Sequence, residues 1–214
     1  MNPATQRSTV TGPAGSLECA IDQPAAGALN TGVLALLCHP HPLHGGTMDN
    51  KVVQTVARAL LQLGCTTLRF NFRGVGASQG AWGEGLGEID DAAAVLAAHR
   101  SAGQPLLLGG FSFGGYVATQ VAARLAVDPP QAAQRLVLVA PAVLNFVAAP
   151  VPADTVLVHG ENDDVVPLQA VLDWARPQQL PVTVLPGAGH FFHGQLPALK
   201  QIVLRAFCAP TVQP

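Results

Sequence analysis

Short apolar runs alternate with longer, alanine-rich segments along most of this chain, and that rhythm leaves few folds open. Runs rich in Val, Leu and Thr predict strands at 16–22, 33–38, 66–71, 105–111, 135–140, 155–160 and 181–185. The segments between them predict helices at 50–64, 87–101, 113–127, 168–175 and 194–208. Several runs are apolar throughout, as in strands covered on both faces, so we expect a mostly parallel sheet with right-handed crossovers.

The first 22 residues break this alternation. The stretch STVTGPAGSLECAID holds a Gly-Pro turn between two short strand candidates, which predicts an antiparallel hairpin at one edge of the sheet. A length of 214 residues suits one α/β domain over 1–214, with the Pro-ended tail 209–214 frayed.

Composition excludes several function classes. Hydrophobic residues make up 49% of the chain, charged residues 11%, and the net charge is -2, so neither a nucleic-acid footprint nor a polybasic membrane patch is present. The polar N-terminus lacks the apolar core of a signal peptide, and no run reaches the roughly 18 apolar residues of a membrane span. We therefore expect a cytoplasmic monomer or homodimer that binds a small molecule. Its four cysteines, Cys19, Cys38, Cys65 and Cys208, form no CxxC pair and are interpreted as core thiols.

One apolar run ends in GGFSFGG, which sets a serine between glycine pairs. Ser112 falls between the strand expected at 105–111 and the helix expected at 113–127. With Gly110 and Gly114 it forms G-x-S-x-G, typical of a nucleophile elbow, where strand and helix crowd together and the serine has strained dihedral angles. Ser112 is thus a candidate nucleophile, although a glycine-flanked serine can also be a plain helix N-cap.

Two later loops carry the other side chains that a serine nucleophile needs. Asp163 and Asp164 follow the run 155–160, and His190 follows the run 181–185. A serine hydroxyl is a weak acid, so an imidazole must take its proton and a carboxylate must hold the imidazole in the correct tautomer. An oxyanion hole is also required, and the N–H of the residue after the nucleophile, Phe113, is the first donor expected.

The order serine, acid, histidine along the chain resembles that of the α/β hydrolases, and two long motifs point to one subgroup of that superfamily. HPHPLHGGTMDNKVV (39–53) and LRFNFRGVGASQG (68–80) resemble the small lidless hydrolases in the dienelactone-hydrolase-like part of that superfamily, often described only as predicted esterases. The resemblance implies an α/β-hydrolase fold: a mostly parallel twisted sheet, helices on both faces and no cap domain.

The resemblance also implies roles for single residues. The family's G-x-x-D-x-x-V-P stretch favours Asp163 as the acid, with Asp164 left open, and the GAGH position favours His190 as the base over His193, which belongs at the surface or the rim. The second oxyanion donor would be the N–H of His41. Pro42 has no N–H, so Leu43 is the close rival.

These motifs contain two alternative candidate sites. His39, His41 and His44 are close enough in sequence to suggest a metal site, but no carboxylate or cysteine joins them, so we expect no metal. The Gly-rich stretch 71–80 lacks the spacing of a dinucleotide-binding turn, and it resembles instead an R-G-x-G-x-S loop (Arg73, Gly74, Gly76, Ser78) that shapes the region below the active site. No cofactor is expected.

The expected substrate follows from what is missing. Residues 141–154, with three prolines, are too few to fold into a lid, so the site should be open. Apolar residues of the loops at the carboxyl edge should line the pocket: Leu43, Met48, Phe113, Val143, Leu144, Phe146, Phe191 and Phe192. We expect an esterase or thioesterase for short to medium acyl chains that works through an acyl-enzyme. A lactonase, a peptidase or an inactive binding protein stays open.

Overall fold

The computed structural model describes residues 4–208, so the tail at 209–214 lies outside the described residues. The strands are β1 (Gln6–Gly12), β2 (Gly15–Asp22), β3 (Leu34–Cys38), β4 (Thr66–Phe70), β5 (Leu106–Phe111), β6 (Arg135–Val139), β7 (Val156–Gly160) and β8 (Thr183–Leu185). The helices are α1 (Lys51–Gln62), α2 (Leu86–His99), α3 (Phe113–Leu125), α4 (Leu168–Ala175) and α5 (Leu196–Cys208), with short 3-10 turns η1 (Pro42–His44), η2 (Pro129–Gln131) and η3 (Arg176–Gln178). Every expected element is present, with ends shifted by at most two residues.

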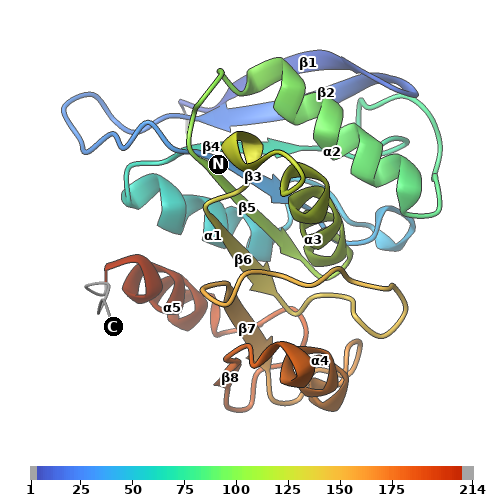
Figure 1. Ribbon diagram of the computed structural model, residues 1–214, viewed down its shortest axis with the longest axis vertical. Coiled ribbons are helices and arrows are strands. Elements are labelled where there is room, and N and C mark those ends of the chain that lie inside the picture. Colours follow the sequence, from blue (N-terminus) through green and yellow to red (C-terminus); the bar gives the residue numbers. More distant parts are fainter. Residues whose placement is uncertain (1–3, 209–214) are drawn as a thin grey trace.

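The strands form one sheet in the order β1-β2-β4-β3-β5-β6-β7-β8. Figure 1 shows the β1–β2 hairpin at one edge and β8 at the other. The hairpin is antiparallel, β2 is antiparallel to β4, and all remaining pairs are parallel. The predicted α/β-hydrolase fold is thus confirmed, and the carboxyl ends of six parallel strands meet at one edge of the sheet.

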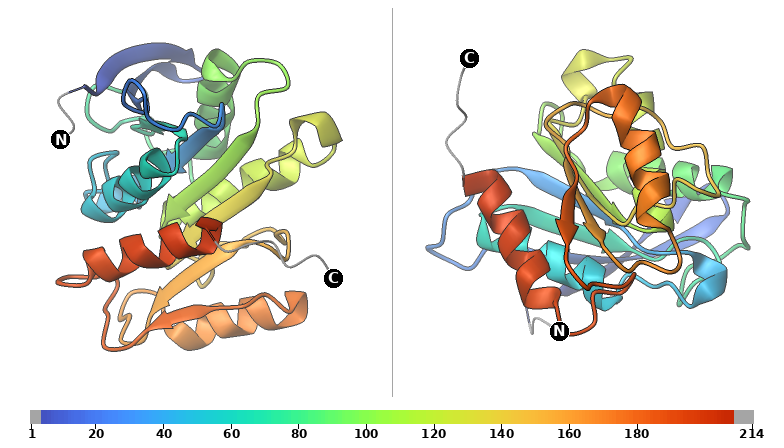
Figure 2. Two further views of the ribbon diagram at one scale, coloured as in Figure 1. Left: turned by 90° about the vertical axis from the view of Figure 1, so that its left-hand side faces the viewer. Right: turned by 90° about the horizontal axis from the view of Figure 1, so that it is seen from below.

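Helices cover both faces of this sheet, as the unbroken apolar runs predict. Along β3, Leu34 and Leu36 pack into a core formed with α2, α3 and α4, whereas Ala35 and Leu37 pack into a second core formed with α1 and α5. Figure 2 shows α1 and α5 on the same side of the sheet. Burial on both faces explains why these strands lack a polar alternation.

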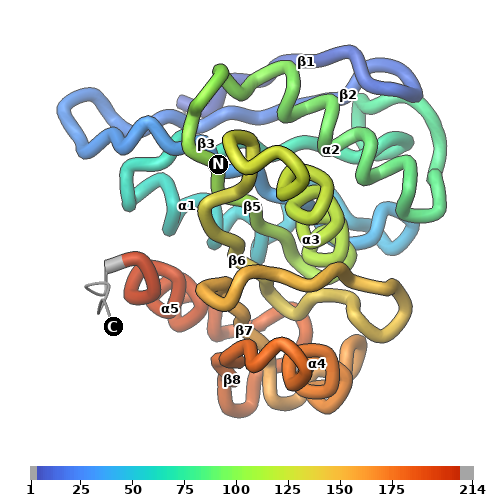
Figure 3. The backbone as a smooth tube through the Cα atoms, in the orientation of Figure 1, coloured from blue at the N-terminus to red at the C-terminus, as the bar shows by residue number. Residues whose placement is uncertain are grey.

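No folded insertion covers the active-site edge. Residues 141–154 contain neither helix nor strand, and Figure 3 shows them as a loop that joins β6 to β7. The absence of a cap domain agrees with the sequence analysis. Among residues 4–208, no helix combines the length and the apolar character needed to cross a membrane.

Candidate active site

Ser112 occupies the turn between β5 and α3, with φ 54° and ψ −119°. Only a few per cent of non-glycine residues have a positive φ, so the turn is strained and must be held by its surroundings. Four backbone hydrogen bonds do so: the Ser112 N–H donates to Val139, and the Ser112 carbonyl accepts from Gly115, Tyr116 and Ala142. Ser112 therefore has the backbone geometry of a nucleophile elbow.

The glycines around Ser112 occupy positions where a larger side chain would not fit. A Cβ on Gly110 would collide with the backbone of Gly114, which belongs to the departing helix. A Cβ on Gly114 would collide with the carbonyl groups of Cys38 and His39 at the end of β3. Gly114 thus lets the start of α3 lie directly against the loop after β3, which the sequence predicts to carry an oxyanion donor.

Asp163 and His190 come together from the loops after β7 and β8. His190 Nδ1 lies 2.7 Å from Asp163 Oδ2, and both side chains are buried. The other carboxylate oxygen, Oδ1, accepts the N–H groups of Val165 and Val166 at 2.9 and 2.7 Å. Burial by itself would raise the pKa of Asp163, but the hydrogen bonds from His190 and Val166 outweigh it and hold that pKa below its usual value. Asp163 is therefore a carboxylate that can orient the His190 ring.

A second buried histidine, which the sequence analysis missed, supports this acid. His159 on β7 bonds through Nε2 to the carbonyl of Val166 at 2.8 Å, and the same nitrogen lies 3.5 Å from Asp163 Oδ2. Burial lowers the pKa of His159. Its place in β7, four residues before Asp163, was the available signal, but the apolar run concealed it.

The loop after β3 is fixed by His39. Its Nδ1 lies 2.6 Å from the carbonyl of Pro40, and its Nε2 accepts the N–H of Phe72 at 3.0 Å. Within residues 4–208, the N–H groups of His41 and Phe113 donate to no protein acceptor, whereas Leu43 donates its N–H to His41 Nδ1 at 3.2 Å. Two backbone N–H groups are therefore free of protein acceptors in the described residues: one directly follows Ser112, and the other lies in the loop after β3.

Aromatic rings support the wall beside these donors. The His41 ring stacks at a tilt on Trp82, with centroids 4.4 Å apart, and lies 5.1 Å from the ring of Phe113. Phe146 packs against Phe113 at 5.1 Å and stacks on Tyr116 at 4.8 Å. Trp82 follows the R-G-x-G-x-S loop in the chain, and its position against His41 was not foreseen from the sequence.

Ser112 and His190 line one open cavity of about 200 Å³. The other lining residues are Pro40, His41, His44, Gly45, Gly46, Asn50, Phe113, Ala142, Asn145, Phe146, Val165, Val166 and Phe191. Within residues 4–208, Ser112 Oγ and His190 Nε2 are not joined by a hydrogen bond. Catalytic hydrogen bonds are often long in enzymes without substrate. The cavity thus joins the candidate nucleophile, the candidate base and the loop after β3.

Several predicted pocket residues lie elsewhere. Met48 is fully buried beneath the loop, where its N–H donates to Asn71, and Phe192 is fully buried in the core shared with α5. Val143 packs against the core formed with α2, α3 and α4, on the other face of the sheet from Phe192. Leu43 and Leu144 are exposed and lie outside the cavity. Loop position at the carboxyl edge was too coarse a criterion, because side chains in one loop point alternately to core, cavity and solvent.

The two alternative sites of the sequence analysis have structural partners. Both ring nitrogens of His39 are occupied, so it cannot join His41 and His44 around an ion without giving up those bonds. In the Gly-rich loop, Arg73 makes a two-pronged contact with buried Asp91 of α2 at 2.7 and 3.0 Å. Ser78 Oγ donates to the carbonyl of Asn71. These bonds shape the loop that leads to Trp82.

Comparisons with known proteins agree with this architecture. Residues 41–153, just over half of the chain, match the family described as serine aminopeptidase, S33. A lidless α/β serine hydrolase from Xanthomonas campestris is 38% identical with a TM-score of 0.86, over 96% of this chain and 94% of that one. An α/β serine hydrolase homologue from Coxiella burnetii is 40% identical with a TM-score of 0.83, over 95% and 97%. An uncharacterized Rickettsia prowazekii protein is 37% identical over 74% of this chain and 71% of its own. The chain belongs to the serine aminopeptidase S33 family of α/β hydrolases.

Proposed function

We propose that this serine hydrolase cleaves carboxylic esters or thioesters with Ser112 as nucleophile, His190 as base and Asp163 as the acid that orients the base. The observation that carries the proposal is the buried 2.7 Å contact between Asp163 and His190. His190 lines the same cavity as Ser112 in its strained turn. Asp164 is exposed and outside this contact, which favours Asp163.

The reaction follows from these roles. His190 Nε2 takes the Ser112 proton while Oγ bonds to the substrate carbonyl carbon, and the tetrahedral intermediate then expels the alcohol or thiol, which receives that proton. Water next attacks the acyl-Ser112 ester while His190 takes one of its protons, and His190 returns that proton to Ser112 Oγ as the acyl–Oγ bond breaks and the carboxylic acid leaves. Asp163 stays ionised throughout and stabilises the His190 imidazolium.

The backbone N–H groups of Phe113 and His41 are the proposed oxyanion donors. Both N–H groups are free of protein acceptors in the described residues, whereas the N–H of Leu43, the alternative donor, is hydrogen-bonded to the His41 ring. Each such donor typically contributes about 2.7–4 kcal/mol to transition-state stabilisation. The structural role of His39 is then to hold the loop that presents the His41 amide.

The cavity favours a neutral, apolar substrate. None of the residues that line it is Asp, Glu, Lys or Arg, and exposed apolar side chains at or beside its mouth include Val165 and Phe191, at 49% and 44% exposure. An aminopeptidase must hold the substrate's α-ammonium group, for which a carboxylate in the cavity is the usual partner. The lining therefore supports an ester over an aminopeptidase substrate, despite the family's name.

A fluorophosphonate probe tests the proposal. It should label the wild-type protein at Ser112 and leave Ser112→Ala unlabelled, while Ser8→Ala, a matched change on β1, labels normally. Labelled enzyme should lose hydrolysis of p-nitrophenyl butyrate, and alanine p-nitroanilide should be a far poorer substrate. Absence of labelling would favour an inactive binding protein, and a preference for the anilide would favour a peptidase. Cytoplasmic location stays a prediction.

A further inference from the structure

A second cavity, of about 420 Å³, lies away from the active site. The carboxyl-terminal halves of α2 and α3, the start of the loop after α2 and the short turn η2 form its walls. Ser112 precedes the first residue of α3, and the cavity borders the last turns of that 13-residue helix from Val121 on, about 13–20 Å away along its axis. A substrate held at Ser112 therefore does not reach it.

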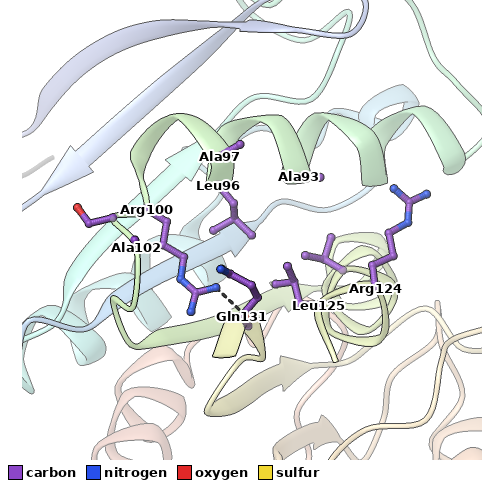
Figure 4. Close-up of a pocket in the computed structure, with 10 residues that line it drawn as sticks. Ala93, Leu96, Ala97, Arg100, Ala102, Arg124, Leu125 and Gln131 are labelled. Atoms are coloured by element: carbon purple, nitrogen blue, oxygen red, sulfur yellow. Dashed lines mark hydrogen bonds between the residues drawn. The ribbon is translucent and has the colours of Figure 1, made fainter. Parts of the chain in front are cut away.

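The floor of this cavity is apolar and buried. Leu96 of α2 is 4% exposed and Val121 of α3 is 2% exposed, and Leu125 and the small side chains of Ala93 and Ala97 complete the apolar lining. Figure 4 shows Leu96 and Leu125 between Arg100 at one end and Arg124 at the other. The volume falls within the roughly 300–1,000 Å³ that is usual for small-molecule sites.

The two arginines differ in their partners. Arg124 is about half exposed and pairs with Asp90 Oδ1 at 2.6 Å, so its charge is already balanced. Arg100 donates through Nε to the carbonyl of Gln104 and through Nη1 to the carbonyl of Gln131, at 2.9 and 2.7 Å. Among residues 4–208 no carboxylate lies within ion-pair distance of Arg100, and the cavity lining contains no Asp or Glu.

This arrangement leaves one cation unbalanced beside an apolar surface. A guanidinium has five N–H donors, so two carbonyl contacts leave others for a ligand. Burial lowers the pKa of Arg100, as expected for a cation partly removed from water without an acid partner. The carbonyl contacts also hold the guanidinium in place at the cavity wall, which reduces the entropy that a ligand must overcome.

We propose that the cavity between α2 and α3 binds a small amphipathic monocarboxylate, whose carboxylate contacts Arg100 and whose hydrocarbon chain lies on Leu96, Val121 and Leu125. A single negative charge matches the one unbalanced guanidinium, whereas a doubly charged phosphate would keep an excess charge. Ser101 and Gln131 also line the cavity and bring polar groups to the end where the carboxylate binds. The site is independent of the catalytic proposal.

Sodium octanoate is the probe, and ¹H–¹⁵N correlation spectra of the full chain are the readout. Saturable shifts should appear at amides of residues 93–102 and 121–131, which border the cavity. Affinity should rise about three- to fourfold per added methylene from hexanoate to decanoate. Octanol, which has the same chain length without the charge, should bind at least about tenfold more weakly.

Arg100→Gln should weaken octanoate at least about tenfold and leave octanol unchanged. Arg58 is an exposed arginine of α1 whose guanidinium is bonded, within residues 4–208, only to Gln54, so Arg58→Gln should change neither affinity. If Arg100→Gln does not fold, Ala97→Phe keeps the guanidinium and fills the apolar part of the cavity between the two arginines, and it should weaken both probes. Shifts confined to the neighbours of Ser112 and His190, equal affinity for octanoate and octanol, or non-saturable shifts would each overturn the site.

Discussion

His39 and His190 are two buried histidines at the same edge of the sheet, with 0% and 3% exposure, and they differ in their partners and in their access to the cavity. Nδ1 of His39 faces a neutral carbonyl, that of Pro40, and its Nε2 is occupied by the N–H of Phe72. Nδ1 of His190 faces the carboxylate of Asp163, and its ring borders the open cavity.

The difference separates a buried imidazole with a structural role from the one proposed as the base. A carbonyl offers no charge to stabilise an imidazolium, and a hydrogen-bonded Nε2 has no lone pair for a substrate proton. Burial therefore lowers the pKa of His39 to about 3, and the ring acts as a neutral brace for the loop that carries His41. In His190 the Asp163 carboxylate lies beside Nδ1, where it can stabilise an imidazolium, and among residues 4–208 Nε2 has no hydrogen-bond partner.

The largest effect should come from removing the active pair. Ser112→Ala and His190→Ala should each lower ester hydrolysis by at least about 10⁴-fold, with the thermal transition nearly unchanged, because both side chains lie at a loop edge. Steady-state rates with p-nitrophenyl butyrate and calorimetry measure the two halves. Retention of a tenth of the wild-type kcat in Ser112→Ala would remove that residue from the nucleophile role.

The carboxylate that distinguishes the two histidines is tested next. Asp163→Asn should lower kcat about 10³–10⁴-fold, because an amide stabilises the wrong imidazole tautomer and gives no charge to the imidazolium. The adjacent Asp164 is exposed and serves as the matched control, so Asp164→Asn should stay within a few-fold of wild type. The reverse ranking would place the acid one residue later.

His39 should affect stability and its pH dependence. Its pKa is about 3 in the folded chain against an ordinary 6.5, so the unfolded chain binds more protons between these values. Stability is therefore full above about pH 6.5 and falls as the pH drops, by about 2 kcal/mol at pH 5 from His39 alone. The lowered pKa values of His159 and Asp163 act in the same direction.

Denaturant unfolding of wild type and His39→Gln between pH 5 and 8 measures this effect. The variant should lose about 1–3 kcal/mol near pH 8, because its glutamine replaces the two hydrogen bonds imperfectly, but its stability should vary less with pH. An unchanged slope would mean that His39 titrates normally in the folded protein and is not a neutral brace.

The smallest effect concerns the cavity between the two histidine loops. Its volume of about 200 Å³ and open mouth should give a rate optimum at short to medium acyl chains, since each buried methylene adds only about 0.8 kcal/mol. Rates on p-nitrophenyl esters should change only a few-fold between neighbouring chain lengths and show no jump at the micellar threshold. A long-chain optimum with interfacial activation would contradict the open, lidless site.

Much of this protein could be predicted from local pattern. The unbroken apolar runs specify buried parallel strands, and G-x-S-x-G at a strand-to-helix junction specifies the strained turn at Ser112, because only glycine fits at Gly110 against the backbone of Gly114. The shortness of residues 141–154 excludes a lid. These features depend on neighbours in the chain, so periodicity and spacing are enough to find them.

Other features were decided by contacts between distant segments. The contact of Trp82 with the His41 ring and the burial of Met48 beside Asn71 each join residues from different loops. The cavity beside Arg100 is likewise lined by residues of α2, α3 and η2, which lie apart in the chain. A linear pattern states which residue types are present, whereas the partner of each polar group depends on packing, and it is packing that gives His39 a carbonyl and an amide as partners and His190 a carboxylate and the edge of a cavity.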